Sequence, residues 1–127
     1  MDIIFLIGRI IFGGFFLFNG INHFKHLADL TSYTASKKVP SPKMAVILTG
    51  VLLLLGGLGV LFGVYTSLSL WLLIIFLVPM SIIMHPFWKE TDPQAKMIEM
   101  TSFMKNIALA GACLMLLQMS IPWVLSL

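Results

Sequence analysis

A set of polar side chains interrupts the apolar stretches of this sequence near their ends: Asn19, Asn22, His23, Ser81, His85, Lys105 and Asn106. Imidazole and ammonium groups can bind an anionic or carbonyl-bearing molecule, and carboxamides and hydroxyls can donate or accept hydrogen bonds. We hypothesise that these groups form one polar pocket for such a head group, and a quinone ring fits this description. The alternative is structural: the groups satisfy one another between helix ends, or they contact lipid head groups and water.

Other chemistry that these residue types allow has less support. Two imidazoles on different helices could ligate a haem iron, but close packing through Gly13 and Gly20 leaves little room for a porphyrin, so we expect no haem. His23 and His26 have a spacing that suits a metal, but they lack a third ligand, and no metal site is expected. Cys113 is the only cysteine. It offers no disulfide or redox pair and is interpreted as a packing residue.

The elements that must position these groups follow from hydropathy. Residues 44–88 contain no Asp, Glu, Lys or Arg, and this run has the length of two membrane crossings of about 20 residues each. Hydrophobic residues make up 59% and charged residues 10% of the chain, against about 25% charged in soluble domains. We therefore predict one all-α membrane domain over residues 1–127, a bundle of four transmembrane helices at about 3–24, 44–62, 68–88 and 103–125.

Helix 3–24 presents one stripe of residues on a single face, because they follow one another at steps of three and four: Arg9, Gly13, Phe16, Gly20 and His23. Lipid disfavours an Arg near mid-membrane by about 2.5 to 3.5 kcal/mol, so this face should point into the bundle. Arg9 stands about 21 Å from His23 along the axis. We therefore interpret it as a structural residue whose partners are outer-leaflet phosphates, carbonyls at helix ends or Asp2.

The segment after the first span predicts a short amphipathic helix on the membrane surface, since Leu27, Leu30 and Tyr33 have helical spacing. Pro40 and Pro42 end it, and Pro42 stands where a new helix can begin. In the next spans, Gly59 and Gly63 form a GxxxG pair that favours close helix packing, and Pro79 predicts a kink in helix 68–88. Residues 63–67 supply the turn between these two helices.

The lysines indicate an orientation. They bracket the loop between the first two spans and the loop of residues 89–102, whereas the turn at 63–67 has no Lys or Arg. The positive-inside rule places both lysine-bracketed loops in the cytoplasm and both termini outside. We expect a protein integral to the cytoplasmic membrane, with the lipid bilayer as its partner and no nucleic-acid partner.

Several short motifs together resemble the DoxX family of small four-helix membrane proteins. They are Gly8-Arg9 with Phe12-Gly13, Asn19-Gly20 with His23-Phe24, the glycines from Gly56 to Gly63, His85-Pro86-Phe87-Trp88, and Phe103-Met104-Lys105-Asn106-Ile107 with Gly111. The resemblance covers almost the whole chain. The family's motif residues correspond here to Arg9, Asn19, His23, His85, Lys105 and Asn106.

The resemblance implies a link to membrane redox chemistry, since the family name comes from a subunit of a quinone-linked thiosulfate oxidoreductase. Distant relatives include a cargo receptor and a receptor-assembly chaperone. Many members carry a Glu three residues before the paired glycines, and here that position is Leu53. A buried carboxylate there would be a natural proton acceptor beside a quinone, so its replacement weakens a proton-coupled redox role.

Three functional hypotheses follow. The first is a small accessory subunit of quinone-linked membrane redox chemistry, in which His23, His85 and Lys105 lie near the head group. The second is an assembly or chaperone-like interaction protein without a cofactor, because the sequence has a glycine-rich second helix and no catalytic dyad. A transporter is the third, although neither half repeats the other. Homo-oligomerisation through helix 44–62 and a membrane-protein partner are both compatible with the sequence.

Overall fold

The computed structural model describes residues 2–126, and its regular elements are helices. In chain order they are α1 (Asp2–Lys25), α2 (Leu27–Ser36), α3 (Pro42–Phe62), α4 (Thr66–Met84), the 3-10 turn η1 (Phe87–Lys89) and α5 (Pro93–Leu116). The all-helical prediction is confirmed, and so are the first two long helices to within two residues at each end. The short helix predicted after the first span is α2.

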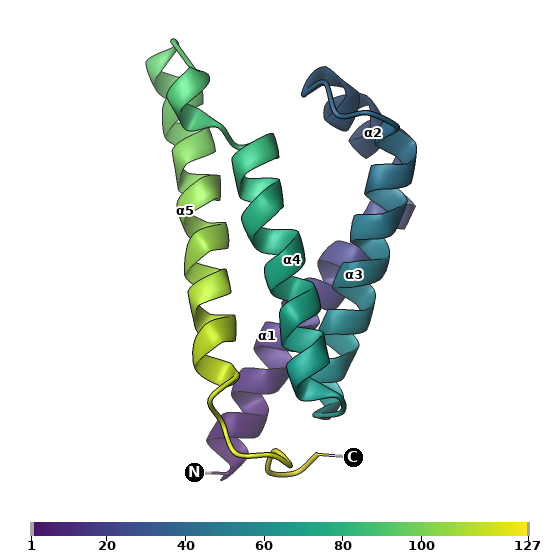
Figure 1. The fold of residues 1–127 in the computed structure, drawn as a ribbon, viewed down its shortest axis with the longest axis vertical. Coiled ribbons are helices and arrows are strands. Elements are labelled where there is room, and N and C mark those ends of the chain that lie inside the picture. The colour runs from purple at the N-terminus through teal and green to yellow at the C-terminus, as the bar shows by residue number, and fades with distance from the viewer. Residues whose placement is uncertain (1, 127) are drawn as a thin grey trace.

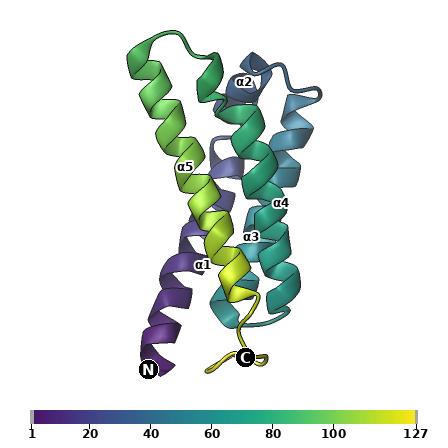
Figure 2. The same cartoon turned by 60° about the vertical axis from the view of Figure 1, so that its left-hand side comes forward.

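The long helices alternate in direction (Figures 1 and 2). One end of the molecule carries α2 and the α4–α5 connection, and we call it the α2 end. The opposite end carries the turn between α3 and α4 together with both chain termini. In space α1 packs against α3, α3 against α4, and α4 against α5, so the helices form a sequential array. This topology puts the two lysine-bracketed connections at one end, as the predicted alternation requires.

The contact between α1 and α3 depends on glycine. A Cβ added to Gly13 would lie 2.9 Å from the Gly57 carbonyl oxygen, and one added to Gly57 would lie 2.8 Å from the Leu17 backbone nitrogen. Gly20 and Gly50 extend the same seam toward the α2 end, against Leu54 and the Phe24 ring. Because no side chain separates these backbones, the two helices approach as closely as small residues allow in a membrane protein.

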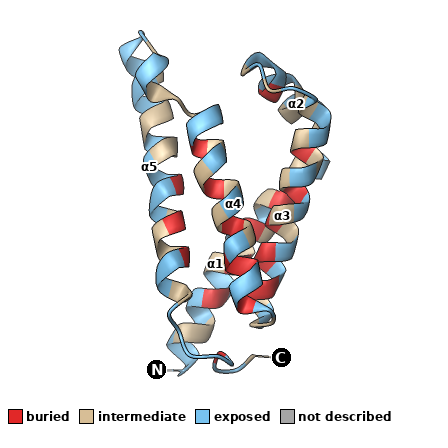
Figure 3. Ribbon diagram, in the orientation of Figure 1, coloured by how far each residue is buried: buried red, intermediate tan, exposed pale blue. Residues whose placement is uncertain are grey.

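The stripe predicted on the first helix faces inward. Its members Arg9, Gly13, Phe16 and Gly20 are all buried, and Phe16 joins a core made with α3, α4 and α5 that includes Leu53, Leu73 and Cys113. Figure 3 shows buried residues on the facing sides of the helices and exposed residues on their outer sides. The outer sides are rich in Ile, Leu, Phe and Met, which is the composition expected where lipid replaces water.

The predicted helix 68–88 is too long at its carboxyl end. α4 ends at Met84, and His85 leaves the helical region with φ −128° and ψ 52°. Pro86 is the reason, because the proline ring disfavours helical geometry in the residue before it. Pro79 lies inside α4.

The predicted helix 103–125 is wrong at both ends. α5 begins at Pro93, where the Asp92 carboxylate accepts a hydrogen bond of 2.9 Å from the Ala95 backbone N–H. This Asp-Pro pair is a helix start signal that the apolar pattern hides. α5 ends at Leu116, and the chain then turns so that the Trp123 ring packs on Phe5 of α1 with centroids 5.5 Å apart.

Within residues 2–126, three segments are long and apolar enough to cross a membrane: Asp2–Lys25, Pro42–Phe62 and Thr66–Lys89. The first ten residues of α5 are polar or mixed, so its apolar part is shorter than a full crossing. The fourth crossing therefore stays a prediction.

Candidate functional site

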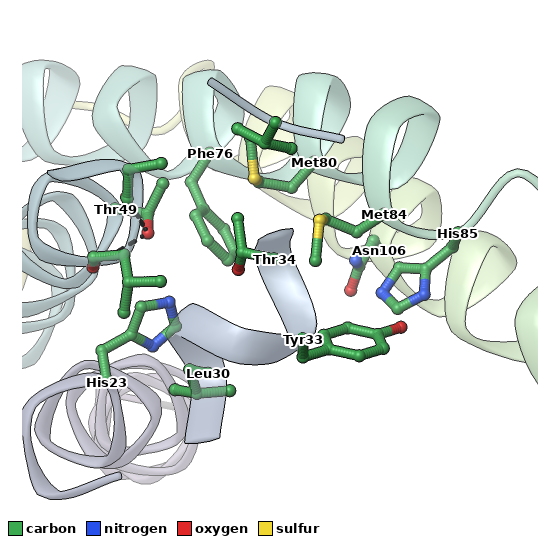
Figure 4. A pocket seen from close by; sticks show the side chains of 13 residues that line it. His23, Leu30, Tyr33, Thr34, Thr49, Phe76, Met80, Met84, His85 and Asn106 are labelled. Atoms are coloured by element: carbon green, nitrogen blue, oxygen red, sulfur yellow. Dashed lines mark hydrogen bonds between the residues drawn. The ribbon is translucent and has the colours of Figure 1, made fainter. Parts of the chain in front are cut away.

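A cavity of about 150 Å³ lies near the α2 end, between the α1–α3 pair and the α4–α5 pair. Its polar lining residues come from different elements and include His23 of α1, Tyr33 and Thr34 of α2, Thr49 of α3, His85 after α4, and Asn106 of α5 (Figure 4). Leucine, valine, alanine, phenylalanine and methionine side chains complete the wall. We call this space the histidine cavity.

His23 projects from α1 into the histidine cavity and reaches α4. Its ring lies edge-on to Phe76, with centroids 6.0 Å apart. Its Nδ1 atom is 3.0 Å from the Asn19 carbonyl oxygen one turn earlier in α1. This contact fixes the ring, and the other nitrogen lies on the cavity side in Figure 4.

His85 lies on the opposite wall and is held by a carboxylate. Its Nδ1 atom is 3.3 Å from Glu99 Oε2, and the Lys37 ammonium is 3.6 Å from the same oxygen. Glu99 of α5 thus links Lys37, in the segment after α2, and His85, at the end of α4, in one polar cluster. Its side chain is 14% exposed, so this pairing is partly shielded from water.

Of the other predicted pocket residues, some line the histidine cavity and others bond within their own helix. Asn106 is buried and lines the histidine cavity, and within residues 2–126 its side chain forms no hydrogen bond to protein. Ser81 is fully buried and donates to the Leu77 carbonyl oxygen at 2.6 Å within α4. The Asn19 amide donates to the Phe15 carbonyl oxygen at 2.8 Å.

Four of the seven predicted pocket residues do not line the histidine cavity: Asn19, Asn22, Ser81 and Lys105. The Lys105 ammonium lies 5.8 Å from the centre of the Phe15 ring, which is a cation–π contact between α5 and α1. The structure therefore brings His23, His85 and Asn106 together, and the other four predicted residues do not line this cavity.

Sequence reasoning missed Glu99 and Tyr33 as members of the site. The apolar pattern places Glu99 in the loop of residues 89–102, because it hides the helix start at Asp92-Pro93. On α5, Glu99 and Asn106 are seven residues apart and share a face, so that start signal could have found the carboxylate.

The pKa of Tyr33 is raised above its ordinary value by its surroundings. Partial burial of the Tyr33 ring is the larger cause, and the negative charge of Glu99 is the second.

The size of the histidine cavity limits what can occupy it. An apolar cavity of about 150 Å³ accepts one benzene ring, and this cavity has a similar volume. A porphyrin contains four pyrrole rings and is several times larger. The cavity therefore has room for about one six-membered ring.

Arg9 is buried at the other end of α1, where it binds carbonyl groups. Its guanidinium donates to Val60 and Leu61 at the end of α3, at 3.3 and 3.1 Å, and to the Val124 and Leu125 carbonyl oxygens of the C-terminal segment. The last carbonyls of a helix have no partner within it, so Arg9 satisfies them. The Val60 and Leu61 carbonyls are helix-end groups, one of the kinds of partner that the sequence predicts for Arg9.

A second cavity, of about 390 Å³, lies beside Arg9 between α1 and α5. Apart from Arg9, its lining residues are apolar: Ile4, Phe5, Gly8, Phe12, Val60, Ala112, Met115 and Leu116. It is larger than the histidine cavity, but the Arg9 donors already bind carbonyl groups. The histidine cavity has several polar groups facing one space, and this convergence makes it the better candidate site.

Leu53, where the family resemblance implies a Glu, has no part in the histidine cavity. Leu53 is 1% exposed and belongs to the apolar core with Phe16 and Val60. The carboxylate of Glu99, which comes from another helix, contacts His85 of the cavity wall.

Comparison with known proteins gives a family match. The family model described as DoxX matches residues 4–86 of the chain. No curated protein and no solved structure matches the chain. The matched region includes α1 to α4 and His85, and α5 lies beyond it.

Proposed function

Because this chain belongs to the DoxX family, we propose that it is a membrane protein that binds the ring of a quinone-type lipid in the histidine cavity. In this proposal it acts as a small accessory subunit of membrane redox chemistry. The observation that carries the proposal is the convergence of His23, His85 and Asn106, from three separate segments, on one space of about 150 Å³.

The chemistry of the cavity supports a ring with two polar substituents. Polar groups on opposite walls can each form one hydrogen bond to such a ring, while Phe76, Met80 and Met84 cover its faces. Aromatic edges and methionine sulfur both pack well on ring systems. An unpaired polar group in hydrocarbon is costly, so a ligand that completes these hydrogen bonds gains free energy.

An accessory role agrees with the groups present. The cavity side chains can bind and orient a ring. A partner protein would then supply the electron transfer, and the cytoplasmic placement of the α2 end remains part of the proposal. The competing role is that of an assembly protein whose cavity is a packing defect.

The proposal is tested by binding of a short-tailed benzoquinone and of its quinol to the purified protein in mild detergent. In His85→Ala, loss of one hydrogen bond should weaken binding of the tighter-binding form by about tenfold. The matched control is His26→Ala, because His26 is exposed and does not line the cavity. Circular dichroism shows whether each variant keeps its helices.

Native mass spectrometry of the protein released from gentle detergent adds an independent test. A bound mass equal to that of a quinone or its quinol supports the proposal, and His85→Ala should reduce its occupancy. Unchanged binding by His85→Ala, or absence of binding by the unmodified protein, would favour the assembly role.

A further inference from the structure

We propose that the histidine cavity is built for the dihydroxy form of its ring ligand, a quinol, and discriminates against the quinone. This inference rests on the proposed function and specifies which chemical form binds. It depends on which nitrogen of each imidazole carries the hydrogen, and the partners of His23 and His85 decide that question.

His23 must carry its hydrogen on Nδ1. The partner of this atom is the Asn19 backbone carbonyl at 3.0 Å, and a carbonyl oxygen can only accept a hydrogen bond. In the neutral ring the other nitrogen, Nε2, is then left with a lone pair. Figure 4 shows one nitrogen of this ring on the cavity side, so the ring presents a hydrogen-bond acceptor to a ligand.

His85 reaches the same state through a different partner. Its Nδ1 atom is 3.3 Å from Glu99 Oε2, and that oxygen is ion-paired with Lys37. A carboxylate only accepts, so Nδ1 again carries the hydrogen and Nε2 presents a lone pair. The cavity-side nitrogen of His85 in Figure 4 lies toward Asn106.

The histidine cavity therefore offers two acceptors from opposite walls. A ring hydroxyl can donate to each acceptor, whereas a quinone carbonyl would place its own lone pairs against them. Asn106 and Tyr33 can either donate or accept, so they bind both forms and do not discriminate. The preference for the hydroxylated ring comes from the two imidazoles.

The test compares a short-tailed benzoquinol with the matching quinone by anaerobic calorimetry at pH 8. We expect the quinol to bind the unmodified protein about tenfold more tightly, because a buried acceptor without a donor is costly. Glu99→Gln should reduce this ratio, since a carboxamide can also donate to Nδ1 and release the other tautomer.

Lys37→Met is the matched control for Glu99→Gln. Both substitutions remove the Lys37–Glu99 ion pair, but only Glu99→Gln changes the partner of His85. Lys37→Met should keep the quinol preference. Loss of the preference in both variants would assign it to the ion pair and overturn the tautomer argument.

The outcomes separate the two proposals. If the quinone binds as tightly as the quinol and His85→Ala weakens both, the cavity is a ring site and the inference of a quinol preference is wrong. If neither ring binds the unmodified protein, the proposed function fails, and the inference fails with it.

Discussion

Gly13 and Gly14 are neighbours in α1 with opposite surroundings, and this contrast permits a sharp test of the α1–α3 contact. A Cβ on Gly13 would lie 2.9 Å from both the Gly57 carbonyl oxygen and the Leu61 backbone nitrogen. A Cβ on Gly14 would have no atom within 4 Å. The same substitution, Gly to Ala, therefore adds the same methyl group to a filled space and to an open one.

The size of the effect follows from these distances. Ordinary contact begins at 3.4 Å, so in Gly13→Ala the two helices must part by about 0.5 Å. The obstacle is backbone, which cannot rotate away, and such overpacking costs about 1–3 kcal/mol. Both variants gain about 0.5–1 kcal/mol in helix propensity, and this gain cancels between them. We expect Gly13→Ala to be about 1–3 kcal/mol less stable than Gly14→Ala.

The assay is unfolding in mixed detergent with increasing dodecyl sulfate, followed by circular dichroism and tryptophan fluorescence. Gly14→Ala should unfold at the same or a higher denaturant fraction than the unmodified protein, and Gly13→Ala at a lower one. Gly57→Ala should behave as Gly13→Ala does, because its Cβ would meet the Leu17 backbone at 2.8 Å. Equal stability of Gly13→Ala and Gly14→Ala would refute the close glycine contact.

Two further predictions concern Arg9 and Tyr33. Arg9→Met should lower the free energy of unfolding by about 2–7 kcal/mol in the same assay, given about 0.6–1.7 kcal/mol for each of its four hydrogen bonds in a membrane protein. It should also speed proteolysis of the C-terminal segment, and an unchanged unfolding curve would contradict the anchoring role. In a Tyr65→Phe background, absorbance titration of the remaining Tyr33 should give a pKa above the ordinary value of about 10, because burial and the charge of Glu99 disfavour the phenolate. Glu99→Gln should lower that pKa, and stability should fall as pH rises above about 10, since the unfolded chain releases this proton first.

Local patterns in the sequence account for most of the helical architecture. Long apolar runs without charge require backbone hydrogen bonds to be satisfied within each segment, and helices do this. The spacing of Arg9, Gly13, Phe16 and Gly20 identified the inner face of α1, because helical periodicity is a property of the chain itself.

The ends of α4 and α5 depended on signals that the hydropathy pattern obscures. Pro86 shortens α4, and Asp92 caps α5, whose first ten residues precede its apolar part. Both are local effects that the sequence contains. The carboxyl end of α5 is different: the helix ends at Leu116, and seven residues later Trp123 packs on Phe5 of α1 in a long-range contact.

The sequence by itself determined that polar groups stand near the ends of apolar helices, and it identified the imidazoles and the Asn106 carboxamide as candidates. Only the tertiary structure decided that His23, His85 and Asn106 share one cavity, that Lys105 contacts Phe15 instead, and that Glu99 holds His85. The physical reason is that periodicity assigns a residue to a face of its own helix, whereas meeting across helices depends on how far each helix is rotated and shifted against its neighbour. In this protein the glycine contacts between α1 and α3 and the packing of α5 on α4 set that rotation and shift, and both involve residues far apart in the chain.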